Sequence, residues 1–171
     1  RLSSVMVEQS RLRNHVTQVE GLSTDSDFSR IVKDDNFVDK TLLIQDFVNA
    51  EESTILVTAP PGFGKSTAID MFKRFFSINV DYKGKSIRQH ISLNYKIFCS
   101  LPLKICKDKT FVERNFGMFP VIHVDYEPLS EVRDLQLALK VLTGIVRKCF
   151  AEHHYLAYNT TLWKDSFERT G

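Results

Sequence analysis

The chain has 171 residues, which is enough for one domain and excludes most multidomain organisations. Hydrophobic residues make up 43% and charged residues 26%, as in globular proteins and unlike disordered or membrane-spanning ones. The net charge is +2, and the three cysteines have no C-x-x-C spacing, which argues against a disulfide framework. We therefore predict an intracellular protein, cytoplasmic or nuclear, with no membrane partner.

The first residues of the chain are poor in apolar side chains. Residues 1–27 end in the polar stretch GLSTDSD, which predicts a peripheral helix or a partly ordered tail. Two apolar clusters follow, at residues 28–32 and 43–48, on either side of the turn-forming sequence Asp34-Asp35-Asn36. This pattern predicts two short helices that flank the core.

Residues 54–58, with the sequence TILVT, form a continuous run that is rich in β-branched side chains. Such a run is typical of a strand buried on both faces in a parallel sheet. A loop rich in proline and glycine follows, and apolar residues then recur every three or four positions from Lys65 to Phe76. The order is therefore strand, glycine-rich loop and helix.

This loop carries the strongest functional motif of the chain. The sequence Ala59-Pro60-Pro61-Gly62-Phe63-Gly64-Lys65-Ser66 fits the phosphate-binding loop, with alanine in place of its first glycine. Backbone N–H groups from Gly62 to Lys65 are expected to surround a polyphosphate at the helix N-terminus. The motif assigns Lys65 to the β- and γ-phosphates, Ser66 to Mg²⁺ and Thr67 to the vicinity of the α-phosphate. The expected ligand is therefore Mg²⁺-ATP.

Positive charge is concentrated in one segment between the loop and the next predicted strand. Residues 79–109 hold seven basic and two acidic side chains, whereas the other residues hold 16 basic and 19 acidic ones. With Tyr82, Tyr95 and Phe98 interleaved, this segment suits nucleic-acid binding through phosphate contacts and base stacking. We favour a solvated insertion whose charges maintain solubility, with nucleic acid as the alternative partner.

A second buried strand is predicted at residues 119–125, FPVIHVD, and an amphipathic helix at residues 131–152 with Ser130 as its N-cap. Alternating strands and helices predict an α/β fold, a three-layer core with a parallel sheet.

A phosphate-binding loop also needs an acidic side chain that helps to hold its metal ion. Asp125 ends the second strand, and Glu127 lies on the same side of an extended chain, so spacing alone leaves both open.

The sequence resembles the AAA-ATPase-like family of P-loop NTPases, which is related to the regulatory STAND-type ATPases. The resemblance rests on FSRIVKDDNFVDKTLLIQDFV, TAPPGFGKSTAIDMFKRFF, IFCSLPLKI and GMFPVIHVDYEPL. Its specific part is Val38-Asp39-Lys40-Thr41 ahead of Phe63-Gly64-Lys65-Ser66, with Phe75-Phe76 after it. The resemblance implies an ATP-driven switch, with residues 28–171 as the P-loop domain and 79–109 as its basic insertion.

The resemblance also changes the expectation for the metal ligand. Family members carry arginines in the loop where this chain has Pro61 and Gly62. In the family, the Pro-Val-Ile strand is the second strand, and a later strand that ends in Asp-Glu coordinates the metal. Residues 163–171, WKDSFERTG, resemble the piece before that strand. The resemblance thus predicts an incomplete domain whose hydrolytic acid lies beyond Gly171, and it weakens Asp125 as a metal ligand.

Three functions remain open at this point. The preferred one is an ATP-binding P-loop module of an AAA-like ATPase, with Lys65 as its catalytic lysine. The second is a non-catalytic module that nucleotide stabilises and that meets a protein partner or a second copy of the chain. The third is a small phosphotransferase, which would need an arginine-rich lid, yet Arg88 is the only arginine of residues 79–109.

Overall fold

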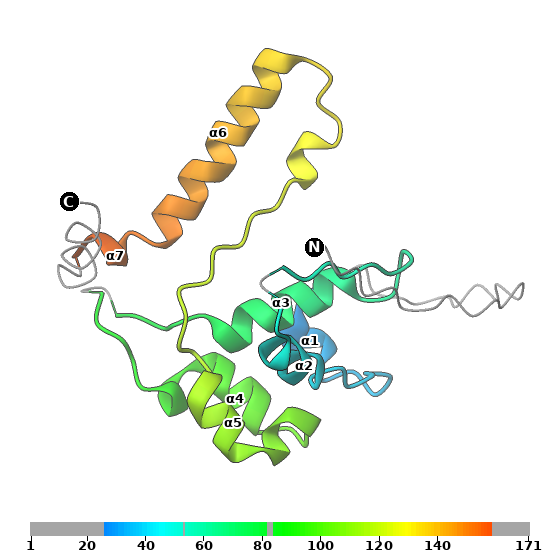
Figure 1. Cartoon of the computed structure of the whole chain (residues 1–171), viewed down its shortest axis with the longest axis vertical. Coiled ribbons are helices and arrows are strands. Elements are labelled where there is room, and N and C mark those ends of the chain that lie inside the picture. The colour runs from blue at the N-terminus through cyan, green and yellow to red at the C-terminus, as the bar shows by residue number, and fades with distance from the viewer. Residues whose placement is uncertain (1–25, 53, 82–83, 159–171) are drawn as a thin grey trace, which may run out of the picture.

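The structure, a computed structural model, describes residues 26–52, 54–81 and 84–158. The regions predicted as an N-terminal tail and as the piece preceding an Asp-Glu strand lie largely outside these residues. Helices and 3₁₀ turns follow one another along the described chain (Figure 1). In order they are α1 Phe28–Ile31, α2 Leu43–Asn49, α3 Lys65–Phe76, η1 Gln89–Ile91, α4 Leu93–Cys99, η2 Lys104–Lys107, α5 Lys109–Asn115, η3 Glu127–Leu129, α6 Leu135–Glu152 and α7 Tyr155–Tyr158.

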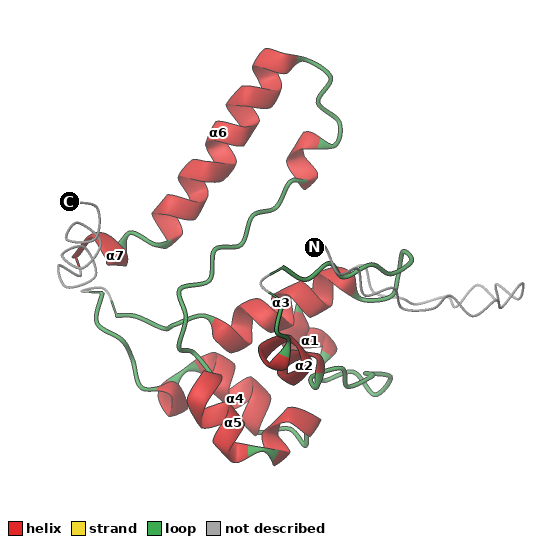
Figure 2. Cartoon of the chain, viewed as in Figure 1, coloured by secondary structure: helices red, strands yellow, loops and turns green. Residues whose placement is uncertain are grey.

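The predicted parallel sheet is absent from the described residues, so the prediction of a three-layer α/β core is wrong. Figure 2 shows helices joined by loops, and helix accounts for 52% of the structure against 3% for strand. Among the described residues, backbone pairing between extended segments is limited to two isolated bridges, a parallel one between Ser77 and Phe119 and an antiparallel one between Val80 and Ser86.

Both predicted strands are extended and largely exposed, although Val121 of the second segment packs against the core. Leu56 in the first is 86% exposed, and Ile122 in the second is 67% exposed. Phe119 alone of the second segment is paired: its N–H donates to the carbonyl of Phe76, and its carbonyl accepts from the N–H of Ile78. A β-branched run has strand propensity, but a strand becomes buried only when neighbouring strands and covering helices meet it. Within the described residues, the first segment pairs with no strand, and the second meets the core near its start, through Phe119 and Val121.

The core is instead a cluster of phenylalanine rings supplied by the helices. Phe28, Phe75, Phe98 and Phe116 are each at most 1% exposed. Their ring centroids lie 5.0 Å apart for Phe28 and Phe98, and 5.0 Å apart for Phe75 and Phe116. The Phe75 ring is nearly perpendicular to that of Phe116, the edge-to-face arrangement that aromatic quadrupoles favour. The packed aromatic rings therefore form the core that a parallel sheet was predicted to form.

We call residues 26–52, 65–81 and 84–117 the helical body, because all of its α-helices contribute to this core. The prediction of a helix over residues 65–76 is confirmed as α3, which packs against α1 and α4. The two short helices predicted around the turn at residues 34–36 are confirmed as α1 and α2. α3 thus begins directly after the glycine-rich loop and is anchored by its buried face.

The basic segment, residues 79–109, is part of the helical body and not a purely solvated insertion. It folds into η1, α4 and η2, and several of its apolar side chains enter the core while the lysines of its described residues are exposed. The buried members are Ile97, Phe98, Leu103 and Ile105. Lys96 and Lys104 are exposed. The charge excess therefore lies on the outer surface of elements that the core requires.

A charged network holds α1 on α3. Arg74 donates from Nε to Asp70 Oδ2 at 2.7 Å and from Nη2 to Asp27 Oδ1 at 2.9 Å. Asp70 also accepts the backbone N–H of Phe28 at 2.9 Å, while Asp27 caps α1 by accepting the N–H of Ser29. The hydroxyl of Ser29, followed by its N–H group and by Arg74, lowers the pKa of Asp27 against the opposing effect of burial. These bonds fix the start of α1 relative to the middle of α3.

Residues 119–152, which we call the arm, leave the helical body and carry α6 (Figure 1). α6 begins at Leu135 with Asp134 as its N-cap, so the predicted start at residue 131 with Ser130 as cap is wrong. Asp134 accepts the N–H of Leu137 at 2.8 Å, whereas Ser130 ends the 3₁₀ turn η3. The predicted apolar stripe of α6 is largely exposed, with Leu135 at 74% and Leu139 at 56%.

None of the helices in the described ranges has the length and apolar composition needed to traverse a bilayer.

Candidate nucleotide-binding site

The glycine-rich loop, residues 59–64, runs from the extended segment into the first turn of α3. Gly64 is the N-cap of α3 and offers no side chain to the helix N-terminus. The first N–H groups of any α-helix have no partner within the helix, and the helix dipole makes this end attractive to anions. Because α3 spans 12 residues and is packed into the core, its N-terminus is held in a fixed position. The loop therefore opens onto a firmly placed helix end.

Two glycines give the loop its shape through their backbone conformation. Gly62 has φ +81° and Gly64 has φ +77°, which lie in the left-handed region that other residues adopt only with strain. A Cβ on Gly62 would meet no atom within 4 Å. Glycine at position 62 is therefore required by the turn itself, and the space beside it stays open to an approaching ligand.

Lys65 folds back over the loop. Its Nζ donates to the carbonyl oxygen of Ala59 at 2.5 Å and to that of Pro60 at 2.9 Å. These carbonyls belong to the start of the loop, so the ammonium group lies against that end of it. Pro60 also accepts the N–H of Phe63 at 3.4 Å, which closes the turn. One positive charge thus lies against the start of the loop.

The remaining predicted residues of the loop lie at its surface. Pro61, Phe63 and Ser66 are exposed, and Thr67 is half-buried. The hydroxyl of Ser66 stands in the first turn of α3, where it can serve as one oxygen ligand for a magnesium ion. Mg²⁺ commonly completes its shell with water and substrate phosphates, so one protein ligand is compatible with binding here.

Asp125 is placed apart from this loop. Its Oδ1 accepts the backbone N–H of Glu127 at 3.0 Å, so the carboxylate caps the turn that becomes η3. Figure 1 shows the segment that carries Asp125 and Glu127 running away from α3 toward α6. No hydrogen bond joins either acid to Ser66 within the part of the chain that the structure describes. Among those residues, no group of three or more His, Cys, Asp or Glu side chains is arranged to hold a metal ion.

A second lysine reaches the loop, and the sequence motif did not assign it. Lys40 Nζ donates to the carbonyl oxygen of Phe63 at 2.9 Å. A Cβ on Gly64 would lie 3.9 Å from the same Nζ, so the ammonium group sits beside the end of the loop. Lys40 belongs to the Asp39-Lys40-Thr41 sequence that resembles the family, but no spacing rule connects it to residues 59–66. The contact becomes visible only when the helical body is assembled.

The neighbours of Lys40 are tied to the basic segment. Asp39 Oδ2 accepts the N–H of Lys104 at 2.7 Å, and Thr41 Oγ1 accepts the N–H of Ile105 at 3.2 Å. Thr41 is 0% exposed and donates its hydroxyl to Asp39 Oδ1 at 2.6 Å. Burial on its own would raise the pKa of Asp39, but the hydrogen bonds from Thr41 and Lys104 outweigh it and lower the pKa. The turn that presents Lys40 is therefore anchored on both sides.

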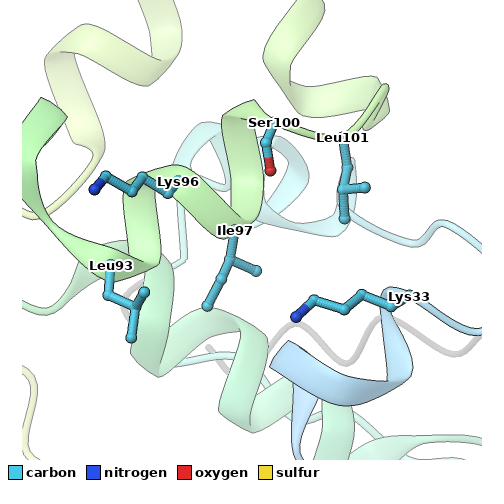
Figure 3. A pocket seen from close by; sticks show the side chains of 6 residues that line it. All are labelled: Lys33, Leu93, Lys96, Ile97, Ser100 and Leu101. Carbon is cyan, nitrogen blue, oxygen red and sulfur yellow. The ribbon is translucent and has the colours of Figure 1, made fainter.

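A shallow pocket of about 220 Å³ lies elsewhere, between α4 and the turn after α1. Figure 3 shows Lys33 facing α4 across this pocket, with Leu93, Lys96, Ile97, Ser100 and Leu101 on the other side. None of these residues belongs to the loop or to the turn that carries Lys40. Most of them are exposed, so this surface has no polar group held in place by its surroundings. The loop is the better candidate site.

Comparison with known proteins identifies the family of the chain. No curated protein and no solved structure gives a match to the chain. The family model AAA-ATPase_like, described as predicted AAA-ATPase, matches residues 24–164. The matched range contains the loop, α3, the turn at Asp39-Lys40-Thr41 and α6. Since it covers most of the chain, the protein belongs to the AAA-ATPase-like family.

Proposed function

We propose that the chain binds Mg²⁺-ATP through residues 59–67 and supplies the nucleotide-binding module of an AAA-like ATPase. One observation carries the proposal: a loop shaped by two glycines leads directly into α3, and the ammonium group of Lys65 bonds the carbonyls at the start of this loop. Ala59, Pro60 and Pro61 form the entry to the loop. Gly62, Phe63 and Gly64 form its turn, and Ser66 and Thr67 follow Lys65 in the first helical turn.

The proposed roles follow from the chemistry of these groups. A polyphosphate needs several donors and positive charge, which backbone N–H groups at a helix start and a lysine can supply together. The carbonyls of Ala59 and Pro60 are weaker acceptors for Lys65 than phosphate oxygens, because charged acceptors form the stronger hydrogen bonds. We expect Lys65 to exchange these carbonyls for the β- and γ-phosphates. Mg²⁺ would take the hydroxyl of Ser66 as a ligand and neutralise part of the phosphate charge.

Nucleotide binding by the Lys65→Ala variant tests this proposal. We expect ATP affinity, measured by calorimetry with the full chain in the presence of Mg²⁺, to fall by about tenfold or more, since a charged hydrogen-bonding group is lost. Lys140→Ala is the matched control, because it removes an exposed lysine of α6. Its affinity should equal that of the wild type. Absence of binding by the wild-type chain, or equal binding by Lys65→Ala, contradicts the proposal.

A second candidate, a non-catalytic module that contacts a protein partner, is favoured by the exposed apolar stripe of α6. Leu135, Leu139 and Val146 are 74%, 56% and 46% exposed. Large exposed apolar patches commonly mark interaction sites. Release of inorganic phosphate from ATP separates the candidates, because an ATPase releases phosphate with turnover and a purely nucleotide-stabilised module binds ATP without release.

A further inference from the structure

Lys40 comes from the turn before α2 and meets the loop 23 residues later in the sequence. Its ammonium group bonds Phe63 at the end of the loop, while that of Lys65 bonds Ala59 and Pro60 at its start. The glycine-rich loop is therefore contacted at both ends by a lysine side chain. Lys65 belongs to the phosphate-loop motif, whereas Lys40 has no assigned role.

The turn that presents Lys40 is held by hydrogen bonds to the basic segment. Asp39 and Thr41, on either side of it, accept the N–H groups of Lys104 and Ile105. The buried hydroxyl of Thr41 also bonds Asp39, so both flanking side chains are held in place. A group that is already positioned loses less conformational entropy when it binds a ligand. This arrangement suits a binding residue better than a freely moving surface lysine.

No carboxylate of the described residues neutralises the charge of either lysine. Within the described residues, neither Lys40 nor Lys65 forms an ion pair with Asp or Glu, and both ammonium groups bond only main-chain carbonyls. Two positive charges thus lie against one loop with neutral acceptors. Oxygens of a polyphosphate carry full negative charge and are stronger acceptors, so they can displace the carbonyls from both lysines.

We propose that Lys40 is a second phosphate-binding cation of this site, which acts together with Lys65 on the polyphosphate chain of a nucleoside triphosphate. The proposal rests on the proposed function of the loop and extends it to a residue outside the phosphate-loop motif. Lys40 is then expected to favour ligands with more phosphate groups. A purely structural lysine would instead hold the loop through its bond to Phe63 and would not distinguish among such ligands.

Affinities of the full chain for ATP, ADP and AMP test the proposal. Lys40→Ala is expected to weaken ATP binding about five- to tenfold, since one exposed charge-assisted bond is lost, and AMP binding by less than about twofold. Lys40→Gln retains a side-chain N–H donor for the Phe63 carbonyl but no charge, and should lose ATP affinity as Lys40→Ala does. Lys33→Ala, which removes an exposed lysine of the turn after α1, should bind all three like the wild type.

The outcomes separate this proposal from the proposed function. If the wild type binds ATP and Lys65→Ala does not, but Lys40→Ala binds ATP unchanged, only the role of Lys40 is overturned. Full ATP affinity in Lys40→Gln, with reduced affinity in Lys40→Ala, also overturns it and assigns Lys40 to loop support. A wild-type chain without ATP affinity overturns both. Thermal unfolding midpoints of the free variants, expected to match the wild type, exclude misfolding as the cause of a loss.

Discussion

The helical body and the arm both carry large apolar side chains, but they differ in where those side chains lie. In the helical body, phenylalanines from α1, α3 and α4 meet Phe116 and become inaccessible to water. In the arm, residues 119–152, every side chain is at least partly exposed, although the leucines of α6 recur at helical spacing. Apolar periodicity therefore determines which face of a helix is apolar. Burial requires a second element that meets this face.

The same difference explains which region holds the candidate site. α3 is packed into the helical body, and its N-terminus and the adjoining loop are positioned by contacts with residues far away in the sequence. Asp125, in the arm, depends on a local turn with Glu127 for its position. A ligand that needs several groups at fixed separations can be bound by the first region and not by a local turn alone.

The largest expected effect comes from replacing matched phenylalanines in the two regions. Phe75→Ala removes a fully buried ring that contacts four other phenylalanines, and should lower the free energy of unfolding by about 3–5 kcal/mol. Phe150→Ala makes the same chemical change at a ring that is 76% exposed, and should cost less than about 0.5 kcal/mol. Urea denaturation of both variants measures the difference. Equal losses would contradict the contrast between the helical body and the arm.

A smaller effect is expected for a matched pair of threonines. Thr41→Val removes the buried hydroxyl that accepts the N–H of Ile105 and donates to Asp39, and should cost about 1–3 kcal/mol because buried polar groups lose their partner. Thr143→Val, in α6, removes only a bond from an exposed hydroxyl to the carbonyl of Leu139 and should cost less than about 0.5 kcal/mol. The same denaturation experiment measures both. If Thr41→Val leaves the free energy of unfolding unchanged, the turn before α2 is not anchored as described.

The smallest expected effect is on the pH dependence of stability that Asp39 causes. The pKa of Asp39 is lowered from its ordinary value of 3.8, so the carboxylate contributes stability above that value and loses it as pH falls through the lower folded-state pKa. Asp39→Asn should therefore be less stable than the wild type by about 1 kcal/mol at neutral pH. The gap should narrow below about pH 4.

Asp134→Asn is the control for this change, because asparagine caps a helix about as well as aspartate and α6 should be little affected. Thermal unfolding midpoints at a series of pH values test both variants. Asp27 has a lowered pKa in both proteins, so it contributes equally and cancels in the comparison. If the difference in unfolding midpoint between wild type and Asp39→Asn stays constant across the acidic range, the lowered pKa of Asp39 is contradicted.

Local sequence patterns predicted local structure and the loop, but not the tertiary arrangement. The spacing of Ala68, Ile69, Phe72 and Phe75 gave α3, and the glycine-lysine motif located the candidate site, because both depend on neighbouring residues. The sheet prediction failed because strand propensity says nothing about the partner strand. The sequence did not predict a role for Lys40 for a related reason. Its contact with Phe63 joins two segments that no motif connects.

The bond between Asp39 and Lys104 has a consequence for the order in which the protein can fold during synthesis. It links residues that are 65 positions apart. The ring of Phe75 is likewise enclosed only when Phe98 and Phe116 are present. A nascent chain that has emerged only as far as the glycine-rich loop and α3 lacks half of the aromatic core. Such non-local closure slows folding, and the exposed rings of the partial chain are targets for aggregation. The glycine-rich loop thus gains its contact with the helical body only after the segment ending at Phe116 has left the ribosome.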